Sequence, residues 1–219
     1  MSEMEIPVFP LSLVLYPGMT LPLHIFEARY KQLIADVHGV GGVFGIVLVE
    51  PDADDAEGAR LHTVGALARI TQLEPLPDGR YNLVVQGERR MRLLDWQEEH
   101  VYATAHVQLL DEDLGSDILA GLVRARFGEY NDILFTLVQM AAPTLPDGAT
   151  AVELSYWVAS NMHLEWAEKQ FLLRCESTDE RLSSLLQLLA REIQKVSMFS
   201  EQALQQGKQF IGGVPFSVN

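Results

Sequence analysis

The sequence predicts an α+β fold, in which strands with one inserted helix are followed by helices alone. Short apolar runs, several of them alternating, occupy the first half, and one stretch of helical spacing interrupts them at residues 26–38. From about residue 117 the apolar residues recur only at helical spacing. Because runs of one element type follow runs of the other, we expect a β lobe at 1–112 and a helical lobe at 113–219.

The opening segment is broken up by Pro7, Pro10, Pro17 and Pro22. Each proline fixes φ and removes a backbone donor, so this segment is neither one helix nor a central strand throughout. We expect two short strands, at 8–11 and 21–24, joined by a turn that contains Pro17 and Gly18. The helix that follows has one apolar face, formed by Tyr30, Leu33, Ile34 and Val37.

The remaining strands are predicted from apolar runs and turn residues. Residues 43–49 form a continuous apolar run of buried-strand length, and 62–73 and 81–94 flank a proline and Asp-Gly turn typical of a hairpin. Gly87 interrupts the second of these strands, which indicates a bulge or a close backbone approach. Residues 101–109 alternate cleanly and complete the strands.

Capping residues mark the predicted helices of the second half. Ser116 or Asp117 begins a helix that ends near Met140, before Pro143. Capping boxes, in which a Ser or Thr is followed three residues later by Glu, then open helices at Thr150 and Ser177. A further helix is expected at 164–173, and the last one carries the strongest apolar stripe, formed by Leu182, Leu185, Leu186, Leu189, Ile193, Val196 and Phe199.

Composition limits the partners and the compartment. A formal net charge of −14 argues against a non-specific grip on nucleic acid or anionic lipid, because both need a basic surface. The single cysteine, Cys175, excludes an internal disulfide framework and suits a reducing compartment. We find no signal peptide and no apolar run near the ~18 residues of a membrane span. We therefore expect a cytoplasmic protein; the sequence leaves its oligomeric state open.

Neither catalytic nor metal-binding patterns emerge from the sequence. The six histidines lack helical spacing to one another or to Cys175, and we expect His24 to be a strand residue with a local hydrogen bond. The acidic stretch 50–57 fails the pattern of a calcium-binding loop. No phosphate-binding loop or nucleophile elbow is present. The prediction is a non-enzyme with no catalytic residues, metal ligands or cofactor.

Two groups of residues are candidates for binding. Arg89, Arg90 and Arg92 form the one basic cluster, which either contacts an anionic partner such as RNA or pairs with the excess of carboxylates. The second group comprises three aromatic residues that either pack within the protein or contact another polypeptide: Trp166, Phe210 and Phe216. The last two lie in a glycine-rich closing segment, which either packs back or engages another chain.

The chain resembles the N-terminal substrate-recognition domain of the Lon protease family. PVFPL at 7–11 and LPLHIFEARY at 21–30 are similar to the start of that domain. Val64-Gly65 with Ile70, and Gly87 with Arg90, resemble its paired strands. Lys169-Gln170 with Leu172-Leu173, and the following Arg181-Leu182 segment, resemble its helices. The similarity covers most of residues 5–196.

The resemblance implies a fold and a role. The family fold is an antiparallel, PUA-like β pseudo-barrel followed by a helical bundle, and the family uses this domain to contact polypeptides. The 219 residues contain neither the ATPase nor the protease module of full-length Lon, so we expect a stand-alone, non-catalytic module that binds unfolded or partner polypeptides. The alternatives are RNA binding, as in other PUA-like proteins, an enzyme whose site the sequence does not reveal, and a structural role.

Overall fold

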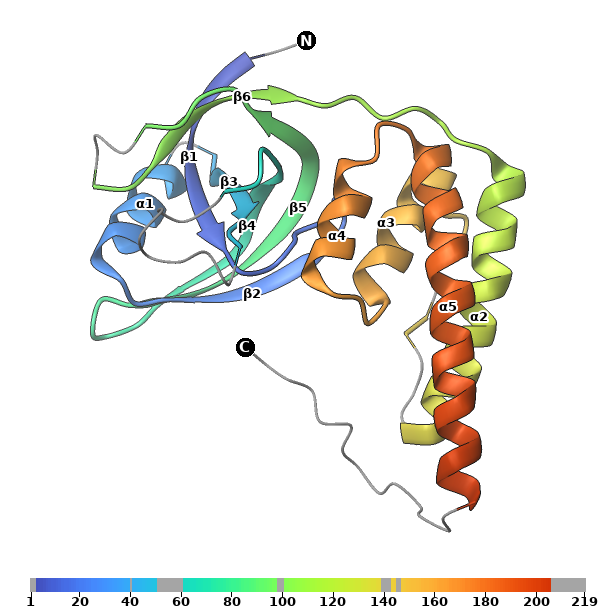
Figure 1. Ribbon diagram of the computed structural model, residues 1–219. Coiled ribbons are helices and arrows are strands. Elements are labelled where there is room, and N and C mark those ends of the chain that lie inside the picture. The colour runs from blue at the N-terminus through green and yellow to red at the C-terminus, as the bar shows by residue number, and fades with distance from the viewer. Residues whose placement is uncertain are drawn as a thin grey trace. The chain divides into compact units, whose positions relative to one another are not determined.

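The computed structural model describes residues 3–39, 41–50, 61–97, 101–138, 143–144 and 147–205 (Figure 1). These residues form the predicted strands first and helices afterwards. The α+β class is therefore confirmed. The elements are β1 Glu3–Leu11, β2 Thr20–Ile25, α1 Ala28–His38, β3 Val43–Leu48, β4 Val64–Pro75, β5 Tyr81–Leu93, β6 Thr104–Leu109, α2 Asp117–Val138, α3 Ala151–Asn161, α4 Trp166–Arg174 and α5 Thr178–Gln205.

The chain divides into two compact units, and each unit is built from two stretches of sequence. The first unit contains Met1–Glu112 and Met162–Cys175, and the second contains Asp113–Asn161 and Glu176–Asn219. In the sequence, the last strand, β6, ends before Glu112, and the first helix of the second unit, α2, begins after it. Helix α4, however, groups with the strands of the first unit and not with the other late helices.

The six strands form one mixed sheet with the order β2-β5-β4-β3-β1-β6, and β6 also pairs with β5. Strand β6 is thus hydrogen-bonded to β1 and also to β5. The expectation that every pair is antiparallel was wrong for β1 and β3, which run parallel with Val8 opposite Gly45. The intervening β2 and α1 supply the long crossover that a parallel pair requires.

Helix α1 lies on the sheet through the face that its spacing predicted. Tyr30, Leu33, Ile34 and Val37 are all buried. They join the core formed with Phe9 and other side chains from β1 to β5, and the Tyr30 ring lies 4.0 Å from the Phe9 ring, centroid to centroid. Burying large apolar side chains stabilises the fold by about 1.5–3 kcal/mol each, so this helix is a main contributor to the first unit.

The predicted turn and the predicted close approach are both present in the β4–β5 hairpin. Gly79 adopts the left-handed conformation at φ +78° in the Asp-Gly turn. Farther along β5, Gly87 donates its N–H to Met19 and accepts from Gly18, and the register of the hairpin shifts beside it. A Cβ at Gly87 would lie 2.1 Å from the Tyr16 carbonyl oxygen. Glycine is therefore required here by the turn that packs on β5.

Side chains attach α4 to the sheet. The buried Tyr16 donates its hydroxyl hydrogen to the Lys169 carbonyl oxygen at 2.8 Å. The buried Gln170 donates from Nε2 to the Val64 carbonyl oxygen, also at 2.8 Å. These bonds join residues more than 100 positions apart in the sequence. They explain why α4 belongs to the first unit although its neighbours in sequence belong to the second.

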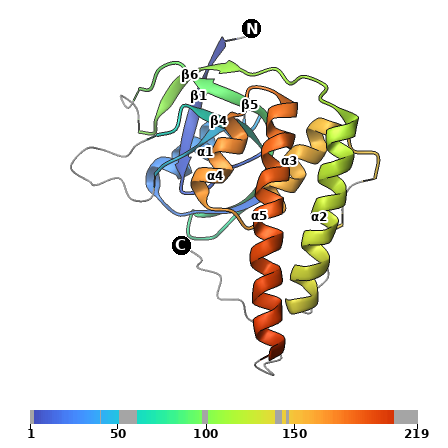
Figure 2. The same ribbon diagram turned by 45° about the vertical axis from the view of Figure 1, so that its right-hand side comes forward.

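The second unit is helical, and α2 and α5 run side by side in both views (Figure 1, Figure 2). Its interior includes the fully buried Arg181, which donates from Nε to the Ser155 hydroxyl at 2.8 Å and lies 3.9 Å from the centre of the Tyr156 ring. The hydrogen bond to the hydroxyl and the cation–π contact with the ring compensate for part of the cost of burying this charge.

The predicted caps are present in this unit, one of them in altered form. Thr150 and Glu153 exchange the reciprocal hydrogen bonds of a capping box at α3. At α5 the Ser177 hydroxyl accepts from the Glu180 N–H, but the Glu180 carboxylate accepts from the Glu176 N–H, one residue earlier than in the standard box. Among the described helices, none combines the length and apolar character that crossing a membrane demands.

Candidate functional site

The outer face of β2, β5 and β4 carries two rows of side chains that cross the three strands. The register of the strands determines which residues share a row. In the first row Pro22 lies opposite Val84, and Val84 lies opposite Gln72. The second row follows from the pairing of His24 with Asn82 and of Asn82 with Glu74. Side chains two residues apart on a strand point to the same face, so both rows lie on one surface.

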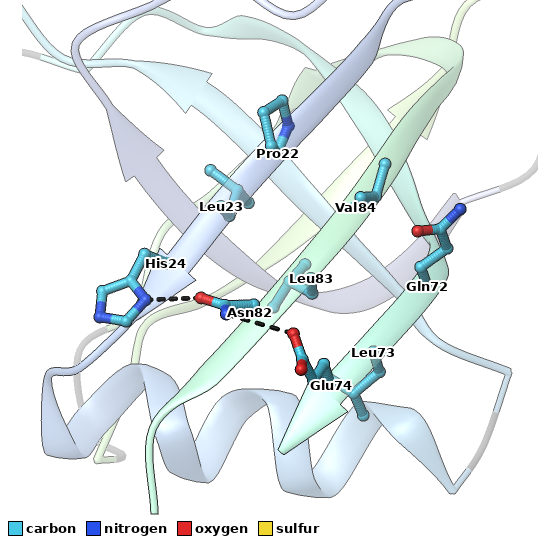
Figure 3. Close-up of a pocket in the computed structure, with 9 residues that line it drawn as sticks. All are labelled: Pro22, Leu23, His24, Gln72, Leu73, Glu74, Asn82, Leu83 and Val84. Carbon is cyan, nitrogen blue, oxygen red and sulfur yellow. Dashed lines mark hydrogen bonds between the residues drawn. The ribbon is translucent and has the colours of Figure 1, made fainter. Parts of the chain in front are cut away.

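The second row is linked by hydrogen bonds from end to end. His24 Nδ1 lies 2.7 Å from Asn82 Oδ1, and Asn82 Nδ2 lies 3.3 Å from Glu74 Oε2 (Figure 3). Beyond His24, a guanidinium nitrogen of Arg80 lies 3.2 Å from Nε2, and Arg80 is itself paired with Asp78 at 2.6 Å. The local hydrogen bond expected for His24 is therefore present, and it is part of a longer row.

These rows line a shallow hollow of about 590 Å³. Figure 3 shows the polar row at one end and Pro22 with Val84 toward the other. The leucines of the intervening positions also contribute to the lining. The nine lining residues are Pro22, Leu23, His24, Gln72, Leu73, Glu74, Asn82, Leu83 and Val84. The hollow thus combines a polar row with a row in which Pro22 and Val84 lie beside Gln72, and a mixture of apolar and polar groups is the usual composition of a recognition surface.

An exposed aromatic ring stands beside this hollow. Phe26, directly after β2, is 62% exposed. Its ring stacks on the ring of His24, with 6.2 Å between the centroids. Phe26 therefore extends the apolar surface next to the polar row.

The structure separates the three arginines of the basic cluster. Arg90 is 2% exposed, and its guanidinium is paired with Glu112. Arg89 is exposed and pairs with Asp111 at 2.8 Å. Arg92 is also exposed and forms no ion pair with the other described residues. The pairing with carboxylates that the acidic composition favoured thus occurs at two of the three positions.

The predicted aromatic candidates lie away from the hollow or outside the described residues. Trp166 begins α4, is half-buried, and meets the His62 ring edge-on at 5.9 Å. Burial lowers the pKa of His62, and Arg174 acts in the same direction, whereas Glu50 opposes both. Phe210 and Phe216 lie outside the described residues.

We find no grouping of three or more His, Cys, Asp or Glu side chains suited to a metal ion within the part of the chain that the structure describes. Cys175 is buried and donates toward the Phe171 carbonyl oxygen at 3.5 Å. It follows α4 directly, so its packing belongs to the attachment of that helix.

Residues of the hollow were not among the sequence candidates. Part of the signal was available, because a hairpin centred on Asp78 and Gly79 places Glu74 opposite Asn82. The pairing of β2 with β5, which brings His24 to the same row, joins segments 58 residues apart. No local pattern in the sequence specifies a pairing of that kind.

Known proteins similar to this chain are proteases of the Lon type. Lon protease 2 of Herpetosiphon aurantiacus is 30% identical over 205 residues, which are 88% of this chain and 24% of that protein. Lon protease of Flavobacterium johnsoniae is 27% identical over 210 residues, which are 89% of this chain and 25% of that protein. The chain therefore spans about a quarter of the length of these relatives.

Solved structures with the same fold are N-terminal domains of Lon proteins. The Lon N-terminal domain protein from Xanthomonas campestris superposes with a TM-score of 0.64 at 23% identity, covering 84% of this chain and 97% of that one. The N-terminal domain of Lon protease from the Mycobacterium avium complex gives a TM-score of 0.60 at 20% identity, covering 85% and 98%. At these identities the similarity establishes the fold alone.

The sequence profile of one family matches almost the whole described chain. That profile is described as the substrate-binding domain of the ATP-dependent protease La (LON), and it matches residues 5–191. The match is to the binding domain and includes neither the ATPase nor the protease module. The resemblance noted in the sequence is thereby confirmed, and the chain belongs to the LON substrate-binding domain family.

Proposed function

We propose that this protein is a non-catalytic module that binds polypeptide segments, and that they dock in the hollow over β2, β5 and β4. The observation that carries the proposal is an open hollow with Pro22 and Val84 toward one end and, at the other, the exposed ring of Phe26 stacked on His24. Exposed apolar surface rimmed by polar groups is typical of protein interaction sites. The family description, a substrate-binding domain of an ATP-dependent protease, supports the same role.

The fold supports the proposal in its finer form. We take the strand path that returns through β6 to be the PUA-like pseudo-barrel of the family, and α2, α3 and α5 to be its helical bundle. Polypeptide is favoured over nucleic acid because the net charge is −14 and two arginines of the basic cluster are paired with carboxylates.

A peptide array tests the proposal. The full-length protein is incubated with overlapping peptides from unrelated proteins, and we expect retention of segments rich in apolar and aromatic residues. Phe26→Ser should weaken the binding of the most strongly retained peptides by about tenfold, because truncating an aromatic side chain that contacts the partner has an effect of this size. Retention of no peptide above background would refute polypeptide binding.

A matched variant locates the site. Phe171→Ser removes the same side chain from α4, where Phe171 is 50% exposed and is not part of the lining. We expect this variant to bind peptides like the unchanged protein. Equal losses in the two variants would place the peptides elsewhere.

Two other surfaces remain proposals. Trp166 contributes to a contact surface on α4, and the closing segment with Phe210 and Phe216 engages a partner chain. Truncation after Ala203 removes the segment and leaves α4 intact. The same array, probed with the truncated protein and with Trp166→Ala, distinguishes these surfaces from the hollow.

A further inference from the structure

The hydrogen bonds of the polar row all run in one direction. The Arg80 guanidinium can only donate, so His24 Nε2, 3.2 Å from it, must carry a lone pair. The single ring proton of His24 is then on Nδ1 and is donated to Asn82 Oδ1, which leaves the Asn82 amide hydrogens to be donated to Glu74. Glu74 is therefore the final acceptor of the row.

Glu74 is also the uncompensated charge of the hollow. His24 is neutral in this arrangement, and the guanidinium of Arg80 is neutralised by Asp78. Glu74 accepts a hydrogen bond from Asn82 but forms no ion pair with another described residue. Asn82 occupies one of its oxygens, and a carboxylate can accept several hydrogen bonds in all. The polar end of the hollow thus complements a cation.

The apolar end lies one step along the strands from this carboxylate. The row of Pro22, Val84 and Gln72 is two residues, or about 6.5 Å along a strand, from the row of His24, Asn82 and Glu74, and Pro22 and Val84 are its apolar members. In an extended ligand, side chains two residues apart point to the same face and have the same spacing. The hollow therefore matches two alternate side chains of a bound segment, one apolar and one cationic.

We propose that the hollow selects extended polypeptide segments that carry an apolar side chain and, two residues away, a lysine or arginine that pairs with Glu74. This inference rests on the proposed function, because it names the class of polypeptide that docks in the hollow. The net charge of −14 acts in the same direction, since it attracts basic segments from a distance.

Three labelled peptides of equal length test the charge preference by fluorescence anisotropy with the full-length protein. Each consists of Gly, Ser and Ala around a central Leu-Ser-Lys, Leu-Ser-Glu or Ser-Ser-Lys sequence. We expect the Leu-Ser-Lys peptide to bind most tightly. Glu74→Gln should weaken it by about threefold, the effect of an exposed ion pair, and should leave the Leu-Ser-Glu peptide unaffected or slightly improved.

Charge reversal supplies the decisive comparison. Glu74→Lys should invert the order of the Leu-Ser-Lys and Leu-Ser-Glu peptides. Glu5→Gln removes the same charge from an exposed position on β1, outside the lining, and should preserve the order. In the unchanged protein, the side-chain amide resonances of Asn82 should shift when the lysine peptide binds, because Asn82 donates to the carboxylate that the cation approaches.

The outcomes separate this inference from the proposed function. If array peptides bind but Glu74→Lys does not change the order of the three probes, or if none of the three binds, the charge preference is refuted and polypeptide binding stands. If the array retains nothing, both fail. An equal effect of Glu5→Gln and Glu74→Gln would attribute the preference to net charge and refute the role of Glu74.

Discussion

Arg90 and Glu112 form a two-pronged ion pair at the end of α4, with Nε 2.6 Å from Oε1 and a terminal nitrogen 3.1 Å from Oε2. The other terminal nitrogen of Arg90 donates to the carbonyl oxygens of Leu173, at 3.0 Å, and Cys175, at 2.5 Å. Carbonyl groups at a helix C-terminus lack partners within the helix, so Arg90 satisfies them from the sheet.

Replacing Arg90 should therefore destabilise the first unit. Arg90→Met removes the ion pair with Glu112 and the hydrogen bonds to the Leu173 and Cys175 carbonyl groups, and we expect a loss of about 3 kcal/mol in the free energy of unfolding. Arg90→Lys should retain part of the lost stability, since lysine keeps the positive charge but lacks the planar guanidinium that bonds both oxygens of Glu112. Urea denaturation measures both. Arg92→Met, two positions along β5 and exposed, is the control, and an equal effect of the two methionine variants would contradict this account.

A methyl group at Gly87 should be poorly tolerated. Gly87→Ala would place its Cβ 2.1 Å from the Tyr16 carbonyl oxygen, and relieving that overlap requires the backbone to move. We expect about 2 kcal/mol of destabilisation by thermal or urea unfolding. Gly121→Ala is the opposite case, because Gly121 lies inside α2 with open space around it, and the change should stabilise by about 1 kcal/mol. Stabilisation by both substitutions would show that the approach to Tyr16 is not tight.

The stability of the first unit should fall on acidification through His62. Burial lowers the pKa of His62 below its ordinary value of 6.5, so the folded state favours the neutral ring. The contribution of the neutral ring to the free energy of unfolding is therefore complete above pH 6.5. It is lost as the pH falls through the lowered pKa that His62 has in the folded state. Proton NMR titration of the ring, assigned with His62→Gln, measures this pKa. A titration at or above 6.5 would contradict the prediction.

Tyr102 should titrate at unusually high pH. Burial, together with the hydrogen bond that its hydroxyl donates to Asp36 at 2.8 Å, raises the pKa of Tyr102 to about 12. An unfolded tyrosine ionises near 10, so this contribution to stability is present below about pH 10 and is lost as the pH rises toward 12. Ultraviolet titration compared with Tyr102→Phe isolates the phenol. Ionisation of this phenol near 10 would show that the contact with Asp36 is not maintained.

Local patterns in the sequence were sufficient for most elements of the fold. The spacing of Tyr30, Leu33 and Ile34 predicted α1, and the pairing of Thr150 with Glu153 predicted the start of α3. Gly87 predicted a close approach that the structure contains. In each case the signal lies within a few residues, where propensity, capping and turn geometry decide the outcome.

Long-range pairing accounts for what the sequence did not predict. The parallel pairing of β1 with β3, the attachment of α4 and the row from His24 to Glu74 all join distant segments. Arg90 illustrates the difficulty. Its residue type and neighbours predicted either contact with an anionic partner or pairing with carboxylates, whereas its contacts with Leu173 and Cys175 depend on a helix more than 80 residues later.

The placement of α4 has a consequence for how the protein is made on the ribosome. Its first unit remains incomplete until Cys175 has been synthesised, because the segment Asp113–Asn161 of the other unit is translated in between. The strands therefore cannot acquire the hydrogen bonds from Tyr16 and Arg90 to α4 before that point in synthesis. A fragment that stops at Glu112 would lack α4 and with it the hydrogen bonds that Tyr16 and Gln170 make in the complete unit.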